Sequence, residues 1–161
     1  MGFLDRFKGR DDADAASAAH EPDAGTAFDD EPVEEIGTRP LTPEEDAALE
    51  AVRARYAEHG IDPPDLASVE AAYDRALAAH TDGDEASAVE VVGTAIGDHL
   101  VAVGGYRWCV SSDPFGTDLA VEPPRKGVPV VTRMLVAVRW MARETGWVTG
   151  VVEHLARAGR R

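Results

Sequence analysis

The apolar residues of the chain recur every three or four positions in several stretches, which is the spacing of one face of an α-helix. Two such stretches lie between residues 43 and 80, on either side of a break at Asp62-Pro63-Pro64. Thr42, followed by Pro43 and two glutamates, is typical of a helix start. We therefore expect a helical hairpin here, with apolar positions at Leu49, Val52, Tyr56, Leu66, Val69, Tyr73 and Leu77.

A third helical repeat begins near Glu85, and its apolar face contains Val89, Val92, Ile96, Leu100 and Val103. Beyond it the apolar period changes to two, which indicates a strand containing Tyr106, Trp108 and Val110. Turn residues at 112–116 and 123–127 lead to further strands, expected at 117–121 and 128–131. Short turns between successive strands predict an antiparallel β-meander.

The remaining residues predict two more helices. One begins at Thr132 and ends near Gly146, and the other covers 148–158. The first is expected to point Met134, Leu135, Val138 and Met141 inward, and the second Val151, Val152 and Leu155. The resulting fold class is α+β, with the helical hairpin and the other helices packed on a three-stranded antiparallel β-meander.

Two glycines lie four positions apart within the third helical repeat, at Gly93 and Gly97. They lack the lysine of a phosphate-binding loop. Because glycine has no Cβ, they favour close approach of another element to this helix.

The charge of −14 is concentrated near the N-terminus, since residues 11–50 carry −13 of it. Residues 11–42 hold few large apolar groups and predict a disordered acidic linker. The linker separates a short amphipathic peptide, residues 1–10, from a single α+β domain at 43–158. The lone Cys109 and the lack of an apolar run long enough for a signal peptide or a membrane span predict a cytoplasmic protein.

Two groups of residues are candidate contact surfaces. Phe3 and Phe7 lie among basic residues and predict a peptide that docks on a protein partner or makes weak contact with a membrane surface. The later part of the domain has a basic bias, and its candidate interaction residues are Arg107, Arg125, Arg133 and Arg139. An alternative occupant of this basic face is the chain's own acidic linker. We do not expect nucleic-acid binding, because the folded region is slightly acidic overall and has no Asn or Gln to read adenine.

No catalytic, cofactor or metal signature stands out. Asp113, Asp118 and Glu122 flank turns and, with His99, match no metal-ligand spacing. Cys109 is expected to be a small packing residue of a strand rather than a nucleophile. The prediction therefore leans away from an enzyme and names no catalytic residue, cofactor or metal.

The segment GTAIGDHLVAVGGYRWCVSSDPFGTDLAV, with the Val-Pro-Val stretch and the arginine-bearing helix after it, resembles the bacterial domain-of-unknown-function family numbered 3806. The matching elements, within about residues 85–145, are Gly93, Gly97, Trp108, Asp113, Gly116, Pro129 and Arg139. The resemblance supports the α+β fold and implies no activity.

Two function hypotheses remain open. The first is a protein-interaction or accessory module with a tethered N-terminal docking peptide. The second is a small-molecule-binding protein or an enzyme, with a cleft between the meander and the helix after Thr132 and with Asp113 and Arg139 among its polar groups.

Overall fold

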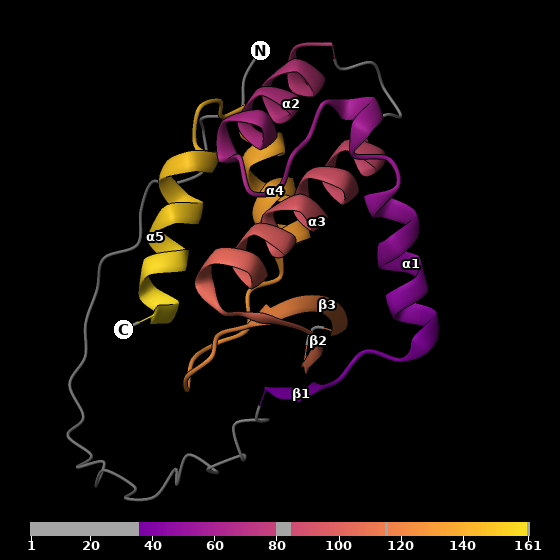
Figure 1. Cartoon of the computed structure of the whole chain (residues 1–161), viewed down its shortest axis with the longest axis vertical. Helices are drawn as coiled ribbons and strands as arrows, with labels where there is room; N and C mark the ends of the chain where they lie inside the picture. Colours follow the sequence, from indigo (N-terminus) through magenta and orange to yellow (C-terminus); the bar gives the residue numbers. More distant parts are fainter. Residues whose placement is uncertain (1–35, 80–84, 115, 161) are drawn as a thin grey trace, which may run out of the picture. The chain divides into compact units, whose positions relative to one another are not determined.

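The computed structural model describes residues 36–79, 85–114 and 116–160 (Figure 1). The predictions for the peptide 1–10, with Phe3 and Phe7, and for residues 11–35 of the linker lie outside the described residues. The elements in chain order are β1 Gly37–Arg39, α1 Pro43–Arg53, the 3₁₀ turn η1 Ala57–His59, α2 Leu66–Ala78, α3 Glu85–Gly104, β2 Arg107–Asp113, β3 Gly116–Glu122, α4 Thr132–Met141 and α5 Val148–Arg160.

The α+β class is confirmed, and α3 is the element on which the others pack. It contacts α1, α2, α4 and α5 as well as β2 and β3 (Figure 1). Its buried residues are distributed around the whole helix, which explains its high apolar content. Glu85–Gly104 has the length and hydropathy of a membrane span, contrary to expectation, and 56% of that window is buried inside the protein.

The sheet has the predicted number of strands, but one of them comes from another part of the chain. Its order is β1-β2-β3, and both pairings are antiparallel. β1 lies in the segment predicted to be linker, with Arg39 opposite Val110. The strand expected at 128–131 is wrong, because only Val130 pairs there, through two backbone hydrogen bonds to Val121. Pro129 has no N–H to extend that ladder.

The start of α1 is confirmed in detail. The Glu45 N–H donates to Thr42 Oγ1 at 3.2 Å, and the Thr42 N–H donates to Glu45 Oε2 at 2.8 Å, which forms a capping box. Arg39 donates to both carboxylate oxygens of Glu45. These hydrogen bonds, from Arg39 first and then from the Thr42 N–H, lower the pKa of Glu45 to about 2. The same contacts connect β1 to α1.

The two predicted N-terminal helices are present, and each packs on α3. α1 ends at Arg53, and after η1 the chain reverses at Gly60, which has a φ of 62°. Asp65 caps α2 by accepting from the Ala67 N–H at 3.1 Å. The apolar face expected for α2 is buried at Leu66, Val69, Tyr73 and Leu77.

Gly93 and Gly97 serve close packing, as predicted. A Cβ on Gly93 would lie 2.9 Å from Cα of Arg133, so α4 crosses α3 at this point. A Cβ on Gly97 would overlap the indole ring of Trp108 on β2. Gly93 thus lets α4 approach α3 closely, and Gly97 leaves room for the indole ring of β2.

α4 is a helix as predicted, but its inward face is different. Met134, Val138 and Met141 are 56%, 45% and 72% exposed, so their assignment to the core is wrong. The buried positions are instead Thr132, Val136 and Trp140. Because apolar residues lie on two sides of this helix, their spacing alone left its orientation open, and the crossing at Gly93 determines it.

Replacing Gly97 by alanine should lower the free energy of unfolding by about 2–3 kcal/mol, since the added methyl group displaces the Trp108 ring. Gly150→Ala is the matched control, because nothing lies within 4 Å of a Cβ there and Gly150 is inside α5. It should raise stability by about 0.5–1 kcal/mol. Urea unfolding of both variants measures the difference, and equal effects of the two substitutions would contradict the packing described.

Val136→Ala should cost about 2 kcal/mol, because Val136 is fully buried. Met141→Gln in the same helix should change stability by less than about 0.5 kcal/mol, because Met141 is exposed. Thermal unfolding of the two variants tests the orientation of α4. A large loss of stability in Met141→Gln would show that Met141 points inward, as the sequence predicted.

Candidate functional site

Asp98 of α3 receives hydrogen bonds from three elements. Arg53 of α1 donates through Nε at 2.9 Å and through Nη2 at 2.6 Å. The Tyr56 hydroxyl donates at 2.8 Å, and the Trp108 indole N–H donates at 2.9 Å. The carboxylate therefore connects α1, the turn after it and β2 to the central helix.

The charge state of this cluster follows from its contacts. Burial by itself would raise the pKa of Asp98, but the hydrogen bonds from Arg53, Trp108 and Tyr56 outweigh it and leave the pKa below its ordinary value. The same burial, with the neighbouring negative charge, raises the pKa of Tyr56. Asp98 is thus ionised and fully engaged, which identifies it as a structural residue rather than a proton donor.

Asp98→Asn should lower stability by about 2–4 kcal/mol at pH 7, because it leaves the partly buried Arg53 without the less exposed of its two ion-pair partners. The folded-state pKa of Asp98 is lowered, so its contribution is present above about pH 4 and is lost as the pH falls toward the folded-state value. The difference between native protein and variant should therefore shrink at low pH. Urea unfolding at neutral and acidic pH measures this, with Glu50→Gln at the exposed partner of Arg53 as the control. If the stability difference between native protein and Asp98→Asn is the same at both pH values, Asp98 does not contribute through its ionised carboxylate.

His99, the next residue of α3, faces a different part of the molecule and is 6% exposed. Its Nδ1 lies 2.8 Å from the Pro63 carbonyl oxygen, in the connection before α2. A carbonyl oxygen only accepts, so Nδ1 carries a proton, and in the tautomer with its single proton on Nδ1 the other nitrogen, Nε2, is an acceptor. No hydrogen bond to Nε2 is formed by the described residues.

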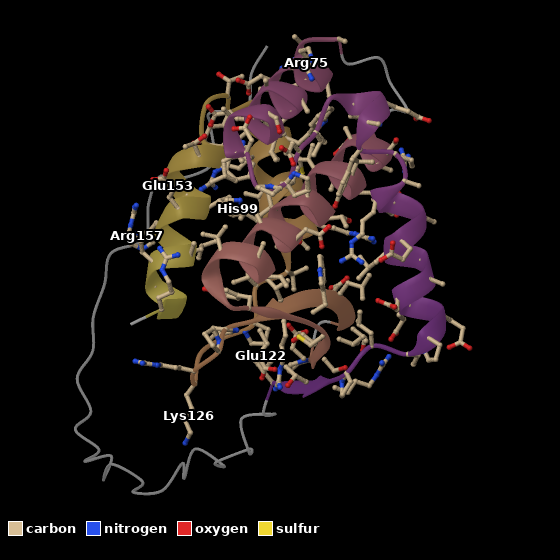
Figure 2. The ribbon with its side chains drawn as sticks, viewed as in Figure 1. Arg75, His99, Glu122, Lys126, Glu153 and Arg157 are labelled. Carbon is tan, nitrogen blue, oxygen red and sulfur yellow. The ribbon has the colours of Figure 1, made fainter. Side chains whose placement is uncertain are left out.

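His99 lines a cavity of about 570 Å³ between the start of α2, α3 and α5. Its size is within the range of ligand pockets, roughly 300–1,000 Å³. Figure 2 shows His99 between α3 and α5, and Glu153 and Arg157 on α5. The apolar part of its wall is formed by Pro64, Leu66, Ala67, Val103 and Ala156.

The charged groups of this cavity are partly engaged with one another. Arg157 Nη1 lies 3.1 Å from the Glu153 carboxylate. Arg160 donates through Nη1 to the Val103 carbonyl at 2.8 Å, and Asp65 caps α2. A guanidinium has five N–H donors, so both arginines keep further donors at the cavity wall.

A second concave region surrounds the loop 123–127 between β3 and Val130. On one side of the loop a cavity of about 610 Å³ is lined by Arg107, Glu122, Arg125 and Lys126. On the other side a cavity of about 240 Å³ has the side chains of Tyr106, Val128, Val130 and Leu155 in its wall and shares Arg125 and Lys126. The loop thus presents two basic side chains between a polar and an apolar hollow (Figure 2 labels Lys126 and Glu122).

The four arginines selected from the sequence have different neighbours. Arg107 and Arg125 line the same cavity, and Arg107 is ion-paired with Glu122 at 2.8 Å. Arg133 is 3.5 Å from the Glu90 carboxylate on α3. Arg139 pairs with Glu144 at 2.9 Å and lies 5.4 Å from the centre of the Trp147 ring.

The cleft expected between the meander and the helix after Thr132 stays a prediction. Asp113 accepts from the Gly116 N–H at 3.0 Å, within the β2–β3 turn. Neither Asp113 nor Arg139 lines the cavities described above. A buried histidine, His99, lines the cavity of about 570 Å³, and the sequence presents it as a polar position in an apolar helix.

Cys109 is 3% exposed on β2. Burial, reinforced by Glu122, raises the pKa of its thiol, which disfavours the thiolate. Within the ranges described, no three His, Cys, Asp or Glu side chains gather as a metal site would require.

The fold is an α+β domain built around one buried helix. A comparison of the sequence with models of protein families identifies the family of this domain. The model described as Domain of unknown function (DUF3806) matches residues 65–150. This is more than half of the 161 residues, and the chain belongs to that family. The match begins earlier than the resemblance seen in the sequence and includes α2. No curated protein and no solved structure matches the chain.

Proposed function

We propose that the domain is a protein-interaction module that binds an acidic, apolar-anchored segment of a partner protein at the loop 123–127. The observation that carries the proposal is the position of Arg125 and Lys126 between two cavities, one polar and one with an apolar wall. This arrangement offers charge recognition and a place for an apolar side chain within one short loop.

The electrostatic part of the argument is local. Arg107, Arg125 and Lys126 face one cavity, and Glu122 is the one acidic side chain in its wall. Glu122 is already bound to Arg107 through Nε and Nη2, both at 2.8 Å. These three cations lie together in a chain of net charge −14, so this region attracts carboxylates.

The apolar part of the argument concerns the smaller cavity. Val128 is 69% exposed at its edge, and Tyr106 forms its floor through a ring that is 6% exposed. The Tyr106 hydroxyl donates to the Leu155 carbonyl at 2.9 Å, which fixes the ring against α5. A cavity of about 240 Å³ accepts one side chain of a peptide rather than a large ligand.

A protein segment fits this surface better than a nucleic acid does. Duplex binding uses on the order of 6–10 phosphate contacts, and the cavity provides three cationic side chains.

The test uses the full chain and a short fluorescein-labelled peptide in which one phenylalanine is flanked by glutamates. Fluorescence anisotropy should show binding that weakens when salt rises from about 50 mM to about 300 mM. The double variant Arg125→Glu with Lys126→Glu should weaken it by at least about tenfold, because it reverses the charge of the loop. A peptide with glutamines in place of the glutamates should bind no better to the native chain than to the variant.

Arg157→Glu with Arg160→Glu is the matched double charge reversal, because both arginines lie on the α5 wall of the other cavity. Equal loss of affinity in this variant would show that only the net charge matters and would refute the loop as the site. A further variant carries Asp29→Asn, Asp30→Asn and Glu31→Gln. If it binds the labelled peptide more tightly than the native chain does, the chain's own acidic segment, and not a partner, is the occupant of the loop.

A further inference from the structure

The cavity at His99 is separate from the loop 123–127 and combines features that a packing role alone does not explain. It has a volume of about 570 Å³, and the His99 side chain in its wall is only 6% exposed. The ring is held in one orientation by the 2.8 Å contact between Nδ1 and the Pro63 carbonyl. An oriented acceptor at a cavity wall is a recognition group for a ligand that donates a hydrogen bond.

The opposite wall provides complementary groups. Arg157 and Arg160 come from the last turns of α5, and each uses one Nη1 hydrogen bond within the protein. Their remaining N–H groups suit a carboxylate, which accepts two hydrogen bonds from a guanidinium. The start of α2 adds a favourable dipole for a negative group at Leu66 and Ala67.

The acidic side chains of the wall do not cancel this preference. The Asp65 carboxylate accepts the Ala67 N–H at the α2 cap, and the Glu153 carboxylate is held by Arg157. The surface between the polar groups is apolar, with Pro64, Leu66 and Val103 in the wall. The lining is therefore suited to a molecule with an apolar body, one hydroxyl group and one carboxylate.

We propose that the cavity between α2, α3 and α5 binds a small hydroxycarboxylate, whose hydroxyl group donates to His99 Nε2 and whose carboxylate contacts Arg157 and Arg160. This site lies elsewhere than the cleft expected from the sequence, which was beside α4. The proposal goes beyond the proposed function, because this ligand contacts other residues than those that bind the partner segment.

The experiment uses the full chain and 3-phenyllactate, which has the required apolar body, hydroxyl group and carboxylate. The probe should shift the carbon-bound proton signals of the His99 ring in NMR spectra and should raise the unfolding temperature. 3-Phenylpropionate lacks only the hydroxyl group and should bind about tenfold more weakly, because Nε2 then has no donor. Equal affinity of the two probes would overturn the proposal. So would binding of 3-phenyllactate that leaves the His99 ring signals unshifted.

His99→Asn is the sharpest variant, because the asparagine amide takes the place of Nδ1 and can still donate to the Pro63 carbonyl. It should keep the fold, bind 3-phenyllactate about tenfold more weakly and lose the preference over 3-phenylpropionate. Arg157→Gln, at an exposed position of α5, should weaken both probes equally by removing a carboxylate contact. If His99→Asn retains native affinity and preference, His99 is a packing residue only and the proposal fails.

The two sites are tested independently of each other. The double variant at Arg125 and Lys126 should bind 3-phenyllactate as the native chain does. Likewise, His99→Asn should bind the acidic peptide with unchanged affinity. Circular dichroism of the same samples checks that each variant is folded. If a folded variant loses the binding of both ligands, the two sites are not separate and the proposal is refuted.

Discussion

The contact between α3 and Trp108 is the constraint on which the rest of the structure depends. Gly97 leaves the space that the indole ring occupies, and Asp98 accepts the indole N–H at 2.9 Å. Close packing and a hydrogen bond at adjacent residues determine both the distance and the rotation of β2 against the helix. Because Arg53 and Tyr56 donate to the same carboxylate, the position of α1 depends on this contact as well.

Helix geometry then separates the roles of three consecutive residues. Successive side chains leave an α-helix about 100° apart, so Gly97, Asp98 and His99 face different neighbours. Gly97 faces the strand, Asp98 receives α1, and His99 faces the cavity beside α5. A helix buried on nearly all sides can thus hold a structural ion pair and a candidate ligand group one residue apart. The Pro63 carbonyl oxygen accepts the hydrogen bond from His99 Nδ1.

The two proposed sites use different physical means of recognition. The loop 123–127 is exposed and places cations at an apolar hollow, which suits a segment that is recognised by charge and by one anchor. The cavity at His99 contains a buried, oriented acceptor, which suits a small molecule with matching donors. Neither depends on Cys109, whose thiol is buried in the sheet.

Local patterns in the sequence determined the helices, the capping box at Thr42, the hairpin of β2 and β3 and the role of the glycines in α3, because each depends on neighbouring residues. The tertiary structure alone decided three other features. β1 is a strand only because β2 offers it an edge, since its three residues are all exposed and have no apolar alternation. The face of α4 that is buried follows from its crossing of α3 at Gly93, and not from its own composition. The cavity at His99 brings together residues from α2, α3 and α5, and no local spacing encodes a convergence of side chains that are far apart in the chain.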